Sequence, residues 1–145
     1  MDLKRTVFSY IGFSILLCGS GCSDTDEIRL PVFPVKGQIS FNGKPAAGAF
    51  VVLHPKGNAD PRLVPPRAIV DADGSFELST YESQDGAAAG EYSLTVEWRK
   101  LVKEGGDFKA GPNVLPARYS KPATSKLEVR VAEGFNQLEP IQLRR

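Results

Sequence analysis

Hydrophobic residues with a period of two restrict the segment from residue 68 to residue 98 to extended backbone. After Gly90 apolar and polar residues alternate strictly, and the apolar ones are Tyr92, Leu94, Val96 and Trp98. This alternation is typical of a half-buried strand. Ile69, Phe76 and Leu78 mark two earlier strands, and residues 71–74 (Asp-Ala-Asp-Gly) form a turn between them because glycine adopts positive φ without steric cost. The segment predicts a β-hairpin, a loop at 82–89 and a third strand.

Short apolar runs recur on both sides of this segment, separated by glycine, proline and asparagine. We expect further strands at 32–41 (weakened or bulged at Gly37), 50–53, 127–131 and 138–143, an Asn-Gly turn at 42–45, loops at 54–66 and 99–112, and a brief edge segment at 114–119. No helix of ordinary length is predicted after residue 21. The pattern predicts an all-β fold, a seven-stranded antiparallel β-sandwich.

Residues 1–21 have the order of a secretory signal peptide. Lys4 and Arg5 precede a hydrophobic run at 7–17, and small residues follow at 19–21. The run of eleven residues is too short for a membrane-spanning helix, which needs about 20. We expect a tether at 22–32 and one folded domain at 33–145.

The end of this leader resembles that of bacterial lipoproteins, in which a cysteine after small residues becomes the lipidated first residue of the mature protein. Cys22 follows Ser20 and Gly21, whereas Gly19 stands where the pattern usually has leucine. Cys18 is the weaker candidate because a bulky leucine precedes it. The resemblance implies an extracytoplasmic protein, on the periplasmic or cell-surface side, anchored in the membrane by acyl chains such as palmitate on Cys22. Ordinary secretion is the alternative.

Charge and cysteine content exclude two kinds of site. The chain has 18 basic and 17 acidic side chains, and without Lys4, Arg5 and Asp2 of the leader 16 of each remain. This balance gives no electrostatic footprint for nucleic acid. Because Cys18 and Cys22 are the two cysteines, we expect no disulfide and no thiol site in the domain.

Seven short motifs follow one another along the domain. They are VKGQI (35–39), NGKP (42–45), GAFV (48–51), DADGSF (71–76), GEYSL (90–94), LPARYS (115–120) and TSKL (124–127). In this order they resemble the carboxypeptidase regulatory-like domains, which are transthyretin-like (prealbumin-like) β-sandwiches, in the form found in short bacterial lipoproteins. The resemblance implies a non-catalytic accessory module of the cell envelope, without cofactor or agreed ligand.

One set of polar residues has the spacing of a twelve-residue calcium loop. It begins at Asp71 and Asp73 and ends at Glu82, but the position that needs glycine for the bend is Phe76. We therefore interpret these residues as turn residues and predict no metal site. A looser calcium site involving Asp71, Asp73 or Asp85 is the alternative.

The residues offer little for catalysis. His54, the single histidine, argues against a zinc site, a Ser-His-Asp hydrolase, and the hydroxyisourate hydrolases and intradiol dioxygenases that share this sandwich. A carboxylate pair for glycoside hydrolysis, drawn from Asp85, Glu91 and Glu97, keeps a hydrolase open as a third function. We predict that the chain is not an enzyme.

Four aromatic residues are candidates for a ligand-binding face: Tyr81, Trp98, Phe108 and Tyr119. Such residues bind sugar or peptide, but more often they cover the end of a core. The sequence predicts a cell-envelope module with a structural or protein-binding role, and a carbohydrate-binding module is the alternative. The expected partners are the membrane, through the lipid anchor, and an envelope protein or polysaccharide.

Overall fold

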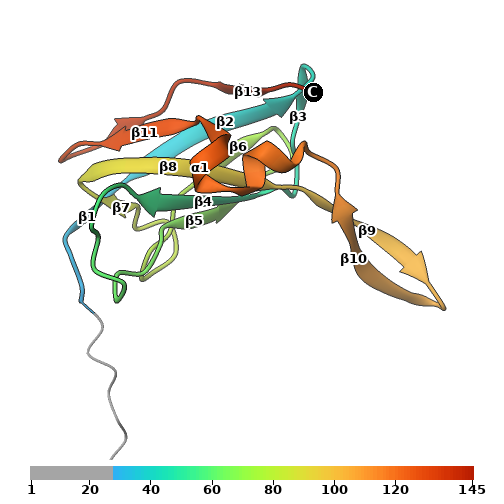
Figure 1. Cartoon of the computed structure of the whole chain (residues 1–145), viewed down its shortest axis with the longest axis horizontal. Coiled ribbons are helices and arrows are strands. Elements are labelled where there is room, and N and C mark those ends of the chain that lie inside the picture. Colours follow the sequence, from blue (N-terminus) through green and yellow to red (C-terminus); the bar gives the residue numbers. More distant parts are fainter. Residues whose placement is uncertain (1–27) are drawn as a thin grey trace, which may run out of the picture.

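Two β-sheets pack around one hydrophobic core in the computed structural model, which describes residues 28–145 (Figure 1). The predicted leader and Cys22 lie outside the described residues. The all-β prediction is confirmed, because the helices in the described part of the chain have four residues each. No helix within residues 28–145 is long and apolar enough to cross a membrane.

The first sheet, which we call the β8 sheet, is antiparallel throughout. Its order is β11 (Glu128–Val131), β8 (Gly90–Glu97), β4 (Phe50–Pro55) and β5 (Arg67–Ile69). The predicted burial of the apolar positions of β8 is confirmed for Tyr92, Leu94 and Val96, although the polar Thr95 between the last two is buried as well. They pair with residues of β4 and β11, so that β8 forms the centre of the sheet.

The second sheet, the β2 sheet, is built on β2 (Val35–Phe41). The strands β3 (Lys44–Pro45) and β6 (Ser75–Glu77) pair antiparallel with β2, whereas β12 (Asn136–Gln137) and β13 (Ile141–Leu143) pair parallel with it. Because Phe41 pairs with both Lys44 and Leu143, the parallel strands lie on the opposite side of β2 from β3 and β6. The expectation of purely antiparallel sheets is wrong for these last two strands.

The predicted turn at 71–74 forms, but it does not close a hairpin within one sheet. It carries the chain from β5 in the β8 sheet to β6 in the β2 sheet. The register of β5, in which Ala68 pairs with Val51, buries Ala68 and leaves Ile69 68% exposed. Ile69, one of the apolar residues by which the sequence marked this strand, therefore lies at the surface and not in the core.

The N-terminal strand differs from the predicted one in two ways. Pro34 interrupts it, so that β1 (Val32–Phe33) pairs with β7 (Ala87–Ala88) and β2 begins at Val35. Gly37 causes no break, because β2 continues through it. Instead, Gly37 makes room for the ring of Phe76, whose Cζ would overlap with a Cβ at position 37.

Two segments differ in structure from the prediction: a predicted loop is a β-hairpin, and a predicted edge segment leads into short helices. Residues 99–112, predicted as a loop, form a hairpin of β9 (Arg99–Glu104) and β10 (Asp107–Asn113). Gly105 and Gly106, with φ of 62° and 95°, make the two-residue turn that such a hairpin needs. The predicted edge segment at 114–119 instead leads into η1 (Ala117–Ser120) and α1 (Pro122–Ser125).

The contact between Phe76 and Gly37 gives a stability prediction. Phe76→Ala should lower the free energy of unfolding by about 3–5 kcal/mol, because it empties a fully buried site. Gly37→Ala should lower it by about 1–3 kcal/mol through overpacking. The double variant should lose less than the sum of the two, because removing the ring also removes the clash.

Urea denaturation measures all three variants, with Phe50→Ala as the control because Phe50 is 42% exposed and should matter little. A loss below about 1 kcal/mol for Phe76→Ala, or strict additivity of the two changes, would contradict this packing.

Candidate functional site

The aspartates considered for calcium serve turns. No group of three or more histidine, cysteine, aspartate or glutamate side chains that could hold a metal occurs among the described residues. Oδ1 of Asp73 accepts hydrogen bonds from the backbone N (2.9 Å) and Oγ (2.6 Å) of Ser75. These bonds lower the pKa of Asp73, so its carboxylate stabilises the turn between β5 and β6.

Asp85 caps the turn between β6 and β7. Its Oδ1 accepts a hydrogen bond from the backbone N of Thr80 at 2.7 Å, and its Oδ2 accepts bonds from the backbone N of Tyr81 at 3.0 Å and of Glu82 at 2.9 Å. Desolvation raises the pKa of Asp85, but these amide donors outweigh it, and the net shift is downward. Both carboxylate oxygens of Asp85 are therefore already occupied by the protein.

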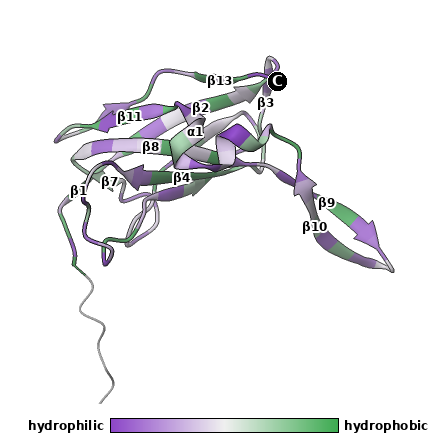
Figure 2. Cartoon of the chain, in the orientation of Figure 1, coloured by the Kyte–Doolittle hydropathy of each residue, from purple (hydrophilic) through white to green (hydrophobic). Residues whose placement is uncertain are grey.

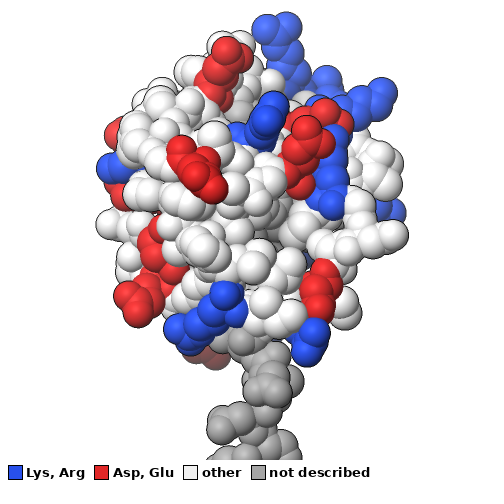
Figure 3. All heavy atoms as spheres, turned by 90° about the vertical axis from the view of Figure 1, so that its left-hand side faces the viewer, with Lys and Arg blue, Asp and Glu red and all other residues white. Residues whose placement is uncertain are grey.

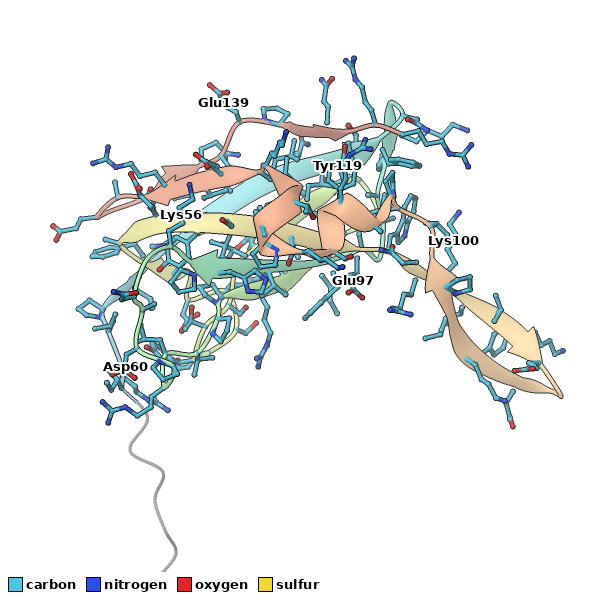
Figure 4. All side chains as sticks on the ribbon, in the orientation of Figure 1. Lys56, Asp60, Glu97, Lys100, Tyr119 and Glu139 are labelled. Atoms are coloured by element: carbon cyan, nitrogen blue, oxygen red, sulfur yellow. The ribbon has the colours of Figure 1, made fainter. Side chains whose placement is uncertain are left out.

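Two of the carboxylates considered for glycoside hydrolysis, Glu91 and Glu97, are too far apart to act as a pair. Glu91 and Glu97 lie near opposite ends of β8. Six residue steps along the strand place their backbones about 20 Å apart, against the roughly 5–10 Å between the carboxyl groups of glycosidases. Charged side chains labelled in Figure 4, such as Asp60, Glu97 and Glu139, are likewise spread along the molecule.

His54 lies in strand β4, not in the loop where the sequence placed it. Its Nε2 is 2.9 Å from Oγ1 of Thr95 on the adjacent strand β8. Partial burial lowers the pKa of His54. The histidine thus pairs two strands of the β8 sheet.

Three of the four candidate aromatic residues, Tyr81, Trp98 and Tyr119, bond to different segments of the chain and do not form one face. The hydroxyl of Tyr81 accepts a hydrogen bond from the backbone N of Leu30 at 2.9 Å, and the hydroxyl of Tyr119 accepts one from the backbone N of Arg144 at 3.1 Å. Nε1 of Trp98 donates to the carbonyl of Ala47 at 2.8 Å. Each ring thus joins a different pair of segments of this chain.

The hairpin β9–β10, which we call the arm, projects from the sandwich (Figure 1). Its register places Leu101 opposite Ala110 and Lys103 opposite Phe108, and opposite residues share one face of a strand pair. These four residues form what we call the apolar face of the arm. Leu101 and Phe108 are each 69% exposed, and Figure 2 shows hydrophobic residues on both strands of the arm.

The other face of the arm is charged. It carries Val102 opposite Lys109 and Glu104 opposite Asp107. Nζ of Lys109 lies 3.1 Å from Oε2 of Glu104, in an ion pair along this face. The arm is therefore amphipathic, although neither of its faces packs against the core.

The root of the arm is held by several contacts. Oδ1 of Asn113 accepts hydrogen bonds from the backbone N of Trp98 at 2.9 Å and of Leu115 at 3.2 Å. The ammonium group of Lys100 lies 4.8 Å from the ring centroid of Trp98, and the ring of Phe41 meets Trp98 edge-on at 6.4 Å. These contacts give the exposed arm a defined attachment.

A groove of about 460 Å³ lies between β11 and β13, the edges of the two sheets. Leu127, Val129, Leu138 and Ile141 line it together with charged residues, and none of its lining residues is aromatic. Aromatic residues usually contribute to sugar binding by stacking on the sugar ring. This groove therefore offers no such stacking.

No protein-family model matches the sequence, and no curated protein matches it. Three solved structures are similar in fold: a proposed carbohydrate-binding protein from Pseudomonas aeruginosa (14% identity, TM-score 0.41, 83% of this chain and 92% of that one), a 9R-lipoxygenase from Cyanothece (11%, 0.42, 78% and 16%) and a DUF3823 family protein from Parabacteroides merdae (18%, 0.41, 79% and 47%). At TM-scores below 0.5, none of the three bears on the function of this chain.

The cap formed by Asp85 predicts a pH-dependent stability. Asp85→Ala leaves three backbone N–H groups without their acceptor and should lower the free energy of unfolding by about 2 kcal/mol at neutral pH. Because the pKa of Asp85 is lowered in the folded state, its contribution is complete above the unfolded pKa near 4 and is lost as the pH falls through the folded pKa.

The difference between wild type and Asp85→Ala should therefore shrink in acid, as measured by urea denaturation at about pH 7 and about pH 3. Glu82→Ala removes a neighbouring exposed carboxylate and is the matched control. A difference that does not change with pH would contradict the role of the ionised cap.

Proposed function

We propose that this chain is an extracytoplasmic lipoprotein of the cell envelope, anchored at Cys22, which binds a partner protein through the apolar face of its arm. The signal-peptide pattern and the small residues before Cys22 support the anchor. The fold and the exposed arm support the binding role.

The arm lies at the end of the domain far from the proposed membrane anchor, where a partner protein can reach it. The described chain begins near β1, at one end of the long axis, and the arm projects from the other end (Figure 1). An anchor in the leader therefore leaves the arm free to reach away from the membrane.

The observation that carries this proposal is the exposure of Leu101 and Phe108, at 69% each. A two-stranded hairpin is marginal in water, and it normally gains stability by burying an apolar face. This arm leaves its apolar face in solvent, although contacts at Trp98 and Asn113 fix its root. Two large apolar side chains exposed on one face of a hairpin suit a site of interaction.

The chemistry of the arm favours a protein partner. Within the described residues β9 and β10 pair only with each other, so both outer edges offer unpaired backbone N–H and C=O groups. Strand addition at such an edge combines backbone hydrogen bonds with apolar side-chain contacts. One observation favours the alternative, a glycan: the exposed ring of Phe108 lies opposite Lys103, which offers a stacking surface beside a hydrogen-bond donor.

Photo-crosslinking in the intact envelope tests the proposed binding face. A benzophenone amino acid at position 108, on the apolar face, should give one defined adduct, and Leu101→Ser in the same chain should weaken it several-fold. The same photoreactive residue at position 102, on the charged face, is the matched control and should give little adduct. Protease sensitivity of the adduct would identify a protein partner.

An adduct of equal yield from positions 102 and 108, or one unaffected by Leu101→Ser, would contradict recognition by the apolar face. An adduct that resists protease and is released by glycan hydrolases would favour the carbohydrate alternative instead.

A further inference from the structure

We propose that the end of the domain opposite the arm rests on the membrane surface, with Phe135 and Leu30 in contact with lipid. This inference rests on the proposed anchor at Cys22. It adds an orientation for the domain and a second interaction surface, with lipid as its partner.

The position at which the chain joins the domain is fixed by Tyr81. Its hydroxyl donates a hydrogen bond to the carbonyl of Ile28 at 3.2 Å and accepts one from the backbone N of Leu30 at 2.9 Å. The side chain of Arg29 lies over the same ring, 5.1 Å from its centroid. Residues 28–30 are thus held against the domain before β1 begins.

The length of chain between Cys22 and Ile28 limits how far this end can lie from the membrane. Six residue steps span at most about 20 Å of extended chain. A lipid on Cys22 would therefore keep the end of the domain near β1 within that distance of the bilayer surface.

Apolar residues are exposed at this same end. A hollow of about 320 Å³ is lined mainly by apolar residues, namely Leu30, Pro31, Phe33, Ala88 and Ala89, with Glu133 at its margin. Leu30 is 41% exposed, and Phe135, in the turn between β11 and β12, is 64% exposed.

The turn that carries Phe135 is held rigidly by the side chain of Asn136. Oδ1 of Asn136 accepts a hydrogen bond from the backbone N of Ala132, and Nδ2 donates to the carbonyls of Ala132 and Gly134, all at 2.9 Å. The backbone N of Asn136 donates to the carbonyl of Pro34 at 2.9 Å, which fixes the turn beside β1. Phe135 is therefore exposed on a turn that is already ordered. Binding through it would cost little conformational entropy.

The contact does not depend on attraction to anionic lipid. Figure 3 views this end of the molecule, and acidic and basic side chains are interspersed on it. Insertion of apolar side chains to the level of the headgroups is the interaction that such a surface allows. A weak contact is sufficient, because the tether keeps the effective concentration of the surface high.

Fluorescence quenching by lipid tests this orientation. The mature chain, lipidated at Cys22, is reconstituted in phosphatidylcholine vesicles with brominated acyl chains, and Phe135→Trp is compared with Phe108→Trp on the arm, a matched control because the two positions are similarly exposed. Trp98 is the only native tryptophan, so Phe135→Trp should lose roughly half of the total emission, whereas Phe108→Trp should lose little. Leu30→Trp should be quenched like Phe135→Trp.

Flotation with the vesicles separates this inference from the anchor. Wild type should float and Cys22→Ser should not, and a Cys22→Ser chain that still floats contradicts the anchor and this orientation with it. If the wild type floats but neither Phe135→Trp nor Leu30→Trp is quenched, the anchor stands and the membrane contact is overturned. Stronger quenching of Phe108→Trp than of Phe135→Trp would overturn the orientation.

Discussion

The ring of Phe76 lies over the backbone of Gly37 on the neighbouring strand, and this contact holds β6 to β2 on the inner face of the β2 sheet, where Phe76 belongs to the core. Phe76 reaches it because the turn at 71–74 takes the chain out of the β8 sheet and into β6 of the β2 sheet. The backbone N of Ile39 donates to the carbonyl of Gly74 at 2.8 Å, which fixes the crossing to β2. Only glycine at position 37 leaves room for the ring, so one large side chain and one missing side chain fit together on this face of the β2 sheet.

Strand β8 connects this core to the proposed binding surface. Its buried residues tie β4 and β11 together, and the chain then continues through Trp98 directly into β9. Trp98 lies at this junction, with its indole N–H bonded to Ala47 and its ring between Phe41 and Lys100. The arm is therefore an extension of the central strand, and its orientation follows from the sandwich. We propose that the sandwich serves as a spacer, with membrane and partner at its two ends.

The sequence predicted strands and turns that depend on local residue patterns. It did not predict which strands pair with one another. The alternation in β8 and the Asn-Gly turn between β2 and β3 have local causes, and both are confirmed. The turn at 71–74 was also predicted, but its residues do not reveal that β5 and β6 enter different sheets, nor that the register of β5 leaves Ile69 at the surface.

The candidate site shows the same division. The arm has a two-glycine turn at 105–106, yet the lysines between its apolar residues made residues 99–112 look like a loop. The capping role of Asp85 needs three backbone amides whose positions only the fold defines. Amide hydrogen exchange on the mature chain, in native envelope and after purification in detergent, tests whether the arm is a binding surface. We expect peptides covering residues 99–113 to be protected in the envelope and to lose that protection on purification, while those of β4 and β8 do not change. Equal exchange of the arm in both states, or envelope-specific protection along β11 and β13 instead, would contradict binding by the arm.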